Sequence, residues 1–261
     1  MSDFLNLPQL PLPPNLAALR ASALRQEPGS GFSTNIRPLR TRRTAAASSP
    51  GPDPPTNETM VQGFEWYVPA DGGHWRRLAR VLPALARLGV SKLWIPPACK
   101  AAAGGEGNGY DLYDLWDLGE FEQKGSVGTK WGTKGELEGL VDVAGEVGVR
   151  VLFDAVLNHK TGADYWEWVS AKKMDEKDRM RQLPEGMPFR RIQAWTGFDF
   201  PGREGRYSEM RWNSEQFTGV DYDDLTGNHG VWKLEKKEWA DDVDEELGNY
   251  DFLWVSPFPY F

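Results

Sequence analysis

The stretch that decides the fold is Arg150-Val-Leu-Phe-Asp154-Ala-Val-Leu-Asn158-His159. A short apolar run bounded by turn signals is typical of a strand covered on both faces, as in a parallel sheet. Asp154 interrupts the run, and Asn158 and His159 end it. Polar groups at the carboxyl end of a barrel strand are typical of site residues. The stretch therefore predicts that a carboxylate, an amide and an imidazole meet at one mouth. The alternative is a helix cap followed by a surface histidine.

The residues before this stretch alternate between strand and helix patterns. Residues 60–66 and 91–95 predict strands, and a third strand starts at Val149. A helix over residues 74–88 has an apolar face of Trp75, Leu78, Leu82, Leu85 and Ala86. A second helix follows the capping box Thr133-Lys-Gly-Glu136, with an apolar face of Leu137, Leu140, Val141, Ala144 and Val147. This order predicts a parallel barrel or a doubly wound sheet. Gly104-Gly105-Glu106-Gly107 lies in a long loop and not at a helix start, which disfavours a dinucleotide fold.

Composition narrows the class of partner. The chain has 261 residues, 40% hydrophobic and 26% charged, with a net charge of −8. No apolar stretch approaches the ~20 residues that span a bilayer, so we expect no membrane insertion. The acidic balance argues against nucleic acid. Twelve Trp, eight Tyr and twelve Phe could stack on sugar rings, although most aromatic side chains fill cores. The single cysteine, Cys99, excludes an internal disulfide and permits a reducing compartment.

The first 58 residues differ in composition from the rest. They are rich in proline and arginine and include Ala45-Ala-Ala-Ser-Ser-Pro50 and Pro52-Asp-Pro-Pro55. Such a segment buries little apolar surface, so we expect a disordered tail. Prolines at positions 8, 11, 13 and 14 interrupt the apolar core that a secretory signal would need.

Several ordered motifs carry a family resemblance. They include Met60-Val-Gln-Gly-Phe-Glu-Trp-Tyr-Val-Pro, Leu93-Trp-Ile-Pro-Pro-Ala, Gly109-Tyr-Asp-Leu-Tyr-Asp-Leu-Trp-Asp-Leu-Gly-Glu-Phe121 and Asp154-Ala-Val-Leu-Asn-His-Lys160. From Met60 to about Leu253 the chain resembles the α-amylases of glycoside hydrolase family 13. Residues 192–202 and 248–252 are similar to the long inserted domain of the calcium-dependent liquefying branch.

The resemblance implies an α/β fold, a (β/α)8 TIM barrel with a long irregular β-rich insertion after the third strand. A barrel of this type takes ~250 residues, so we expect a truncated barrel of about three strands. The expected parts are a disordered Pro/Arg-rich tail at 1–58, the first part of the catalytic barrel at 59–158, the insertion domain at 159–253 and an aberrant tail at 254–261. The sequence of residues 254–261 departs from the family pattern. A misread splice junction or a premature stop would explain this departure.

The resemblance also assigns roles to individual residues. Tyr110 would be the aromatic platform beneath the sugar at the cleavage point, and His159 would hydrogen-bond the same sugar. Asp154 would support the active-site network. Asn158 and Asp251 would be ligands of Ca²⁺, which prefers six to eight oxygens, so two ligands predict weak binding. A packing role is the alternative for Tyr110, and the acidic run over residues 241–246 is more typical of a solvated face.

Retaining glycoside hydrolysis requires two carboxyl groups ~5–5.5 Å apart. In the family this pair lies on strands beyond the end of this sequence. None of the remaining candidates matches it; they are Glu65, Asp111, Asp114, Asp117, Glu120 and Asp154. The sequence therefore predicts a fragment of a cytoplasmic α-amylase that is inactive alone, whose complete relative cleaves internal α-1,4-glucosidic bonds in starch or glycogen. The alternatives are a noncatalytic carbohydrate-binding or regulatory module and an exo-acting glucosidase of the same family. The oligomeric state is left open.

Overall fold

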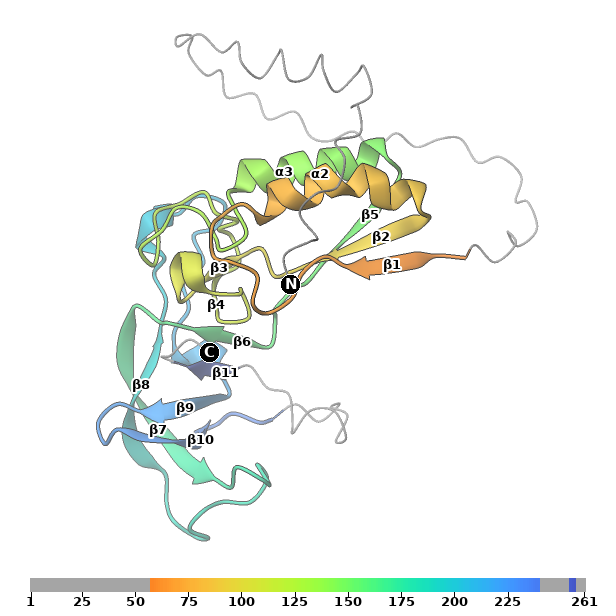
Figure 1. Cartoon of the computed structure of the whole chain (residues 1–261). Helices are drawn as coiled ribbons and strands as arrows, with labels where there is room; N and C mark the ends of the chain where they lie inside the picture. The colour runs from red at the N-terminus through yellow and green to blue at the C-terminus, as the bar shows by residue number, and fades with distance from the viewer. Residues whose placement is uncertain (1–56, 240–253, 257–261) are drawn as a thin grey trace, which may run out of the picture. The chain divides into compact units, whose positions relative to one another are not determined.

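A computed structural model of the chain describes residues 57–239 and 254–256. The expected tail at 1–58, apart from its last two residues, and the acidic run at 241–246 lie outside these ranges. Within them the chain forms a three-stranded, a six-stranded and a two-stranded sheet together with two α-helices (Figure 1). Neither helix is long and apolar enough to cross a membrane.

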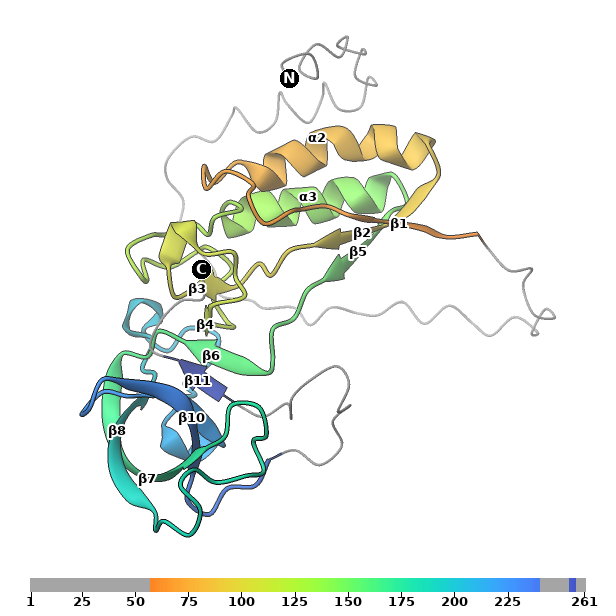
Figure 2. The same cartoon turned by 60° about the horizontal axis from the view of Figure 1, so that its bottom comes forward.

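The three-stranded sheet is parallel. Its strands are β1 (Thr59–Gln62), β2 (Val90–Ile95) and β5 (Arg150–Phe153), with β2 in the middle. Helices α2 (His74–Arg87) and α3 (Lys134–Glu146) lie side by side over one face of this sheet (Figures 1 and 2). The alternation of strand and helix in an α/β arrangement is therefore confirmed for this part of the chain.

The core under the two helices follows the predicted apolar faces. Trp75 and Leu82 of α2 and Leu140 of α3 are fully buried, and they pack with Leu93 of β2. The Glu136 carboxylate accepts a hydrogen bond from the Thr133 backbone N–H at 2.9 Å, which confirms the capping box. The predicted apolar face of α3 is wrong at one residue, because Val141 is 47% exposed.

Two strand predictions need correction. β5 was expected to be covered on both faces, but Leu152 and Phe153 are 37% and 46% exposed. The physical reason is that β5 is an edge strand, pairing with β2 alone among the described residues. β1 ends at Gln62, short of the predicted Trp66. Gly63 still donates to the Trp94 carbonyl at 2.8 Å, after which the chain leaves the sheet.

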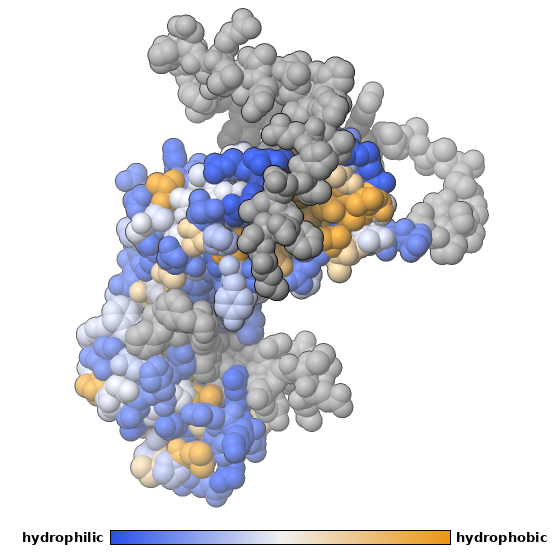
Figure 3. Space-filling model, viewed as in Figure 1, coloured by the Kyte–Doolittle hydropathy of each residue, from blue (hydrophilic) through white to orange (hydrophobic). Residues whose placement is uncertain are grey.

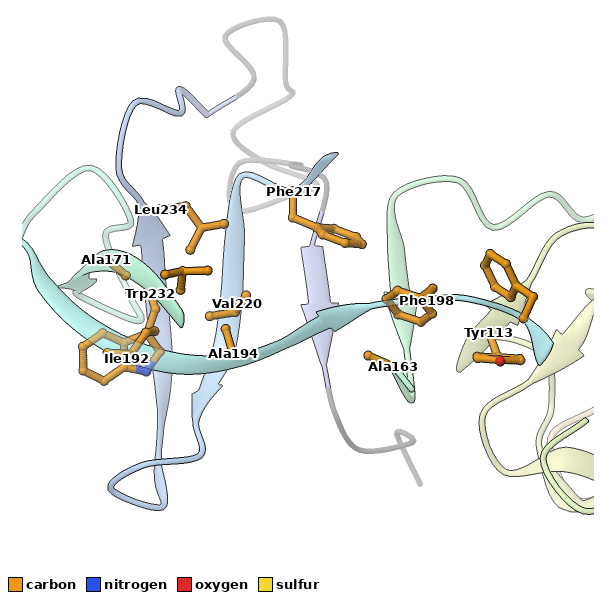
Figure 4. Close-up of a cluster of buried hydrophobic side chains, with 12 residues drawn as sticks. Tyr113, Ala163, Ala171, Ile192, Ala194, Phe198, Phe217, Val220, Trp232 and Leu234 are labelled. Atoms are coloured by element: carbon orange, nitrogen blue, oxygen red, sulfur yellow. The ribbon is translucent and has the colours of Figure 1, made fainter. Parts of the chain in front are cut away.

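The six-stranded sheet follows the predicted start of the insertion. In spatial order its strands are β6 (His159–Thr161), β11 (Trp254–Ser256), β9 (Gly219–Asp223), β10 (Asn228–Leu234), β7 (Tyr165–Met174) and β8 (Arg190–Gly197). β9, β10, β7 and β8 pair antiparallel, whereas β11 pairs parallel with β6 and β9. The backbone of 254–256, in the span expected to be an aberrant tail, is thus part of this sheet. Strands β7 to β10 of this sheet and the adjoining segments contribute side chains to one hydrophobic core, which includes Ile192, Ala194, Phe198 and Trp232 (Figure 4).

A small sheet of β3 (Lys100–Ala101) and β4 (Leu112–Asp114) lies in the loop after β2. Short 3₁₀ turns complete the irregular segments at η1 (Gly104–Glu106), η2 (Pro201–Arg203) and η3 (Ser214–Gln216). Tyr113 of β4 packs on Phe198 and Phe200, and its hydroxyl donates to Asp164 at 2.8 Å. This loop is therefore joined to the insertion by both apolar and polar contacts.

Candidate functional site

The candidate site lies where β2 and β5 end. Ile95 pairs with Phe153 in the parallel register, so the residues next to them leave the sheet at the same edge. Asp154, immediately after β5, is half-buried, and its Oδ2 accepts a hydrogen bond from the Trp94 indole Nε1 at 3.2 Å. The sequence did not single out Trp94, although its place at the end of the middle strand was a usable signal.

Tyr110 completes this group from the loop before β4. Its hydroxyl donates to Asp154 Oδ2 at 2.7 Å. Burial, with the Asp154 carboxylate as acceptor, raises the pKa of Tyr110, so the phenol stays protonated and remains a donor. Its ring lies nearly parallel to that of Trp66, with centroids 6.0 Å apart and planes 7° apart. Trp66 is 45% exposed, so the two rings present an aromatic surface beside a fixed carboxylate.

His159, the first residue of β6, is half-buried beside Tyr110. Its Nε2 lies 2.6 Å from the Tyr110 backbone oxygen. A carbonyl oxygen only accepts, so Nε2 carries the hydrogen in this contact. Tyr110, Asp154 and His159 are therefore brought together, while the Nε2 atom of His159 is already used by the backbone.

The described residues include one of the two predicted metal ligands. Asn158 is exposed, and Asp251 lies outside the described ranges. No group of three or more His, Cys, Asp or Glu side chains within 57–239 could hold a metal ion. Calcium prefers six to eight oxygen ligands, of which the described residues offer the Asn158 amide oxygen as the one predicted donor.

A hollow of about 320 Å³ lies next to the aromatic pair. Trp66, Asn108, Asp111 and Lys130 are among the residues that line it. Burial raises the pKa of Asp111, whose Oδ2 accepts from the Ala103 N–H at 2.8 Å. Lys130 Nζ donates to the Trp66 carbonyl at 3.2 Å. The hollow thus combines an aromatic wall with polar groups, as sites for polyhydroxylated ligands do.

Most of the other candidate carboxylates have structural partners. Asp114 and Asp117 are fully buried; Asp114 pairs with Arg203 at 2.7 Å, and Asp117 lies 3.5 Å from the Lys100 ammonium. Gln123 Nε2 donates to both carboxylates at 3.0 and 2.9 Å. Glu120 is bound by Lys134 at 2.7 Å. The Asp114–Arg203 pair joins the loop to the insertion, and Asp154 and Asp111 remain as the candidate carboxylates beside the aromatic pair.

Comparison with known proteins places this geometry in a family. The family model described as "Alpha amylase, catalytic domain" matches residues 40–198, which include Tyr110, Asp154 and His159. The chain belongs to the alpha-amylase family. The α-amylase resemblance predicted from the motifs is confirmed.

The alpha-amylase relatives support the same assignment. The chain is 44% identical to the alpha-amylase of Bacillus licheniformis over 78% of its own length and 39% of the relative. It is 44% identical to the glucan 1,4-alpha-maltohexaosidase of Bacillus sp. strain 707 over 77% of its own length and 39% of that protein. The cytoplasmic alpha-amylase of Escherichia coli is 40% identical over 76% of the chain and 40% of the relative. The chain thus spans about two fifths of the length of these relatives.

Proposed function

We propose that this chain supplies the glucan-binding part of an α-amylase active site, and that the complete protein hydrolyses internal α-1,4-glucosidic bonds in starch or glycogen. The observation that carries the proposal is the Trp66–Tyr110 stack, with the Tyr110 hydroxyl fixed on Asp154. Aromatic faces bind the apolar faces of sugar rings, and the adjacent polar groups pair with sugar hydroxyls. In this proposal Tyr110 and His159 contact the substrate, and Asp154 positions Tyr110.

Binding and bond cleavage are separate in this proposal. Retaining hydrolysis requires a nucleophilic and an acidic carboxyl group about 5–5.5 Å apart. Among the described residues Asp154 is hydrogen-bonded to Tyr110, Asp111 accepts from the Ala103 backbone N–H, and Asp114 and Asp117 are held by cations elsewhere. The 261-residue chain should therefore bind α-glucans without releasing reducing sugar.

The binding proposal is tested with maltoheptaose and two matched tryptophan variants, by calorimetric titration. Trp66 and Trp168 are both 45% exposed, but Trp168 lies on β7, outside the candidate site. Trp66→Ala should weaken binding about tenfold, a loss of about 1.4 kcal/mol, while Trp168→Ala should leave binding unchanged. Equal losses, or a loss confined to Trp168→Ala, would place the glucan elsewhere. Reducing sugar released from soluble starch by the purified chain would overturn the proposed lack of cleavage.

The three-stranded parallel sheet is proposed to be the start of a (β/α)8 barrel, with the division between barrel and insertion at residues 158 and 159. The exposed side of this sheet supports the proposal. Met60 and Leu152 lie on the face away from the helices and are each more than a third exposed, and hydrophobic residues gather at the surface beside these strands (Figure 3). Further strands of a barrel would cover them. A variant extended by the following family segment should show greater hydrogen-exchange protection in β5, and unchanged protection would contradict the barrel.

Calcium is proposed as the cofactor of the complete protein, held in part by the Asn158 amide oxygen and the Asp251 carboxylate. Oxygen donors of this type suit a hard cation, and the liquefying-type motifs support it. For the 261-residue chain we expect a thermal midpoint that differs little between calcium and a chelator. A large stabilisation by calcium that Asn158→Ala leaves intact would remove Asn158 from the ligand set.

A cytoplasmic location is proposed on two grounds. One relative carries the name cytoplasmic alpha-amylase, and the single cysteine, Cys99, is buried. Fractionation of cells that express the tagged chain should recover it with the cytosol, and recovery from the medium or an organelle would contradict the proposal.

A further inference from the structure

A second pocket lies in the insertion, away from the residues of the candidate site. It is a hollow of about 270 Å³ beside β7, β8 and β10, closed on one side by the loop that contains Pro184. Three of its lining residues are cationic: Lys172, Lys173 and Arg190. None of the lining residues is acidic. We call this hollow the basic pocket.

The cations of the basic pocket are unequally compensated. Arg190 pairs with Asp223 at 3.3 Å, and its guanidinium lies 4.4 Å from the centre of the Trp232 ring. Lys172 Nζ lies 4.4 Å from the Phe189 ring centre, and Lys173 Nζ lies 3.4 Å from the His229 carbonyl oxygen. Neither lysine forms an ion pair with a described residue. A pocket lined by such charges attracts anions.

The floor of the basic pocket adds a second observation. Trp232 is 2% exposed, yet its indole N–H has no hydrogen-bond acceptor in the described residues. Figure 4 shows this side chain within the insertion core, beside Ile192 and Ala194. Buried donors are nearly always paired, because an unpaired one loses its water contacts without replacement. Arg190 and Lys173 lie over the ring of this side chain, with the guanidinium 4.4 Å and the ammonium 5.6 Å from the ring centre, so the ring carries two cations on the side of the pocket.

We propose that the basic pocket binds a phosphate group, either as the free ion or as a monoester on a sugar. Phosphate oxygens accept hydrogen bonds from Lys173 and Arg190, whose charged groups both lie over the Trp232 ring, and the doubly negative group matches these two cations. The volume admits a phosphate together with one sugar ring. This site uses insertion residues only and does not depend on the proposed glucan binding.

The test follows the indole ¹H–¹⁵N resonance of Trp232 in the full chain, assigned by its loss in Trp232→Phe. Inorganic phosphate, glucose 6-phosphate and maltose are titrated separately at constant ionic strength. Both phosphates should shift the resonance saturably, and maltose should not. Tighter binding of glucose 6-phosphate would identify the monoester as the ligand, and equal binding would identify the free ion.

Matched lysine variants complete the test. Lys173→Gln should weaken phosphate binding about tenfold, because one charge-assisted contact is lost. Lys177→Gln removes an equal charge from an exposed position outside the pocket and should change nothing. A resonance that does not shift, the same shift with maltose, or equal weakening by both variants would overturn the proposal. Matching circular dichroism spectra would exclude loss of the fold as the cause.

Discussion

The buried pair of Asp114 and Arg203 gives the most direct stability prediction. Asp114 is fully buried, and its carboxylate accepts from Trp116 N–H at 3.0 Å, Gln123 Nε2 at 3.0 Å and Arg203 Nε at 2.7 Å. In Asp114→Asn the amide oxygen can replace Oδ2, which accepts from Gln123 and Arg203, or Oδ1, which accepts from Trp116. In either orientation the amide nitrogen faces at least one N–H donor, and the Arg203 charge stays buried without its carboxylate.

The expected loss of unfolding free energy follows from the contacts that this substitution breaks. Breaking one side of a buried ion pair costs about 3–5 kcal/mol, since an uncompensated charge is left inside. Arg203 Nη1 still donates to the Ser208 carbonyl at 2.6 Å, so the middle of this range applies, about 4 kcal/mol. With a urea slope of about 2 kcal/mol/M, the unfolding midpoint should fall by about 2 M.

The assay is urea unfolding followed by tryptophan fluorescence and circular dichroism, with Glu185→Gln as the control. Glu185 is 79% exposed and lies 3.6 Å from Arg181, so its removal should cost about 0.3–0.5 kcal/mol. If both variants lost less than about 1 kcal/mol, the network would not hold the loop to the insertion, and the reasoning would be wrong.

Three further predictions concern packing and pH. Leu82→Ala, at a fully buried position, should lower the free energy of unfolding by about 2–5 kcal/mol, and a loss below about 1 kcal/mol in urea titrations would contradict the core assignment. Gly107→Ala should destabilise by about 1–3 kcal/mol, because its Cβ would lie 2.7 Å from both Asp111 carboxylate oxygens. Gly135→Ala, in α3 with open space around it, should instead stabilise by about 0.5–1 kcal/mol, and the same sign for both changes would refute the steric argument. Burial lowers the pKa of His74 below 6.5, so the unfolded chain takes up the proton first as pH falls. The stability that the neutral imidazole contributes is therefore complete above pH 6.5 and is lost as the pH falls below it. His74→Gln should flatten this part of the plot of urea midpoint against pH, and an unchanged plot would contradict the assignment to His74.

The edge position of β5 makes this strand a place where the chain could pair with other chains. An exposed strand with apolar residues offers unpaired backbone groups to other chains. Leu152 and Phe153 lie on such a strand, whereas Arg150 at its start and the neighbouring Lys92 of β2 both pair with Glu58. The charged end is thus paired within the chain, whereas the apolar end, next to Asp154, is the part that further strands of the proposed barrel would cover.

Local patterns in the sequence were sufficient for the first layer of the fold. The spacing of Trp75, Leu78 and Leu82 places one helix face in the core because a helix repeats every 3.6 residues. The Thr133 capping box marks the start of α3 because its partners lie within one turn. The motifs around Asp154 also identified the family, since their order along the chain is itself the signal.

The family resemblance proposed a common site for Tyr110 and His159, but only the tertiary structure showed the contacts that join Tyr110 to Asp154 and to His159. Tyr110 lies 44 residues before Asp154 and 49 before His159, and no local spacing shows that their side chains meet. The carboxylates of Asp114 and Asp154 look alike in sequence, but one is buried against Arg203 and the other faces an aromatic pair. The apolar run of β5 predicted a covered strand, yet burial depends on which strands pair beside it. The spacing of apolar residues determines which face of a helix or strand is apolar. The long-range contacts that cover each face form only when the chain folds.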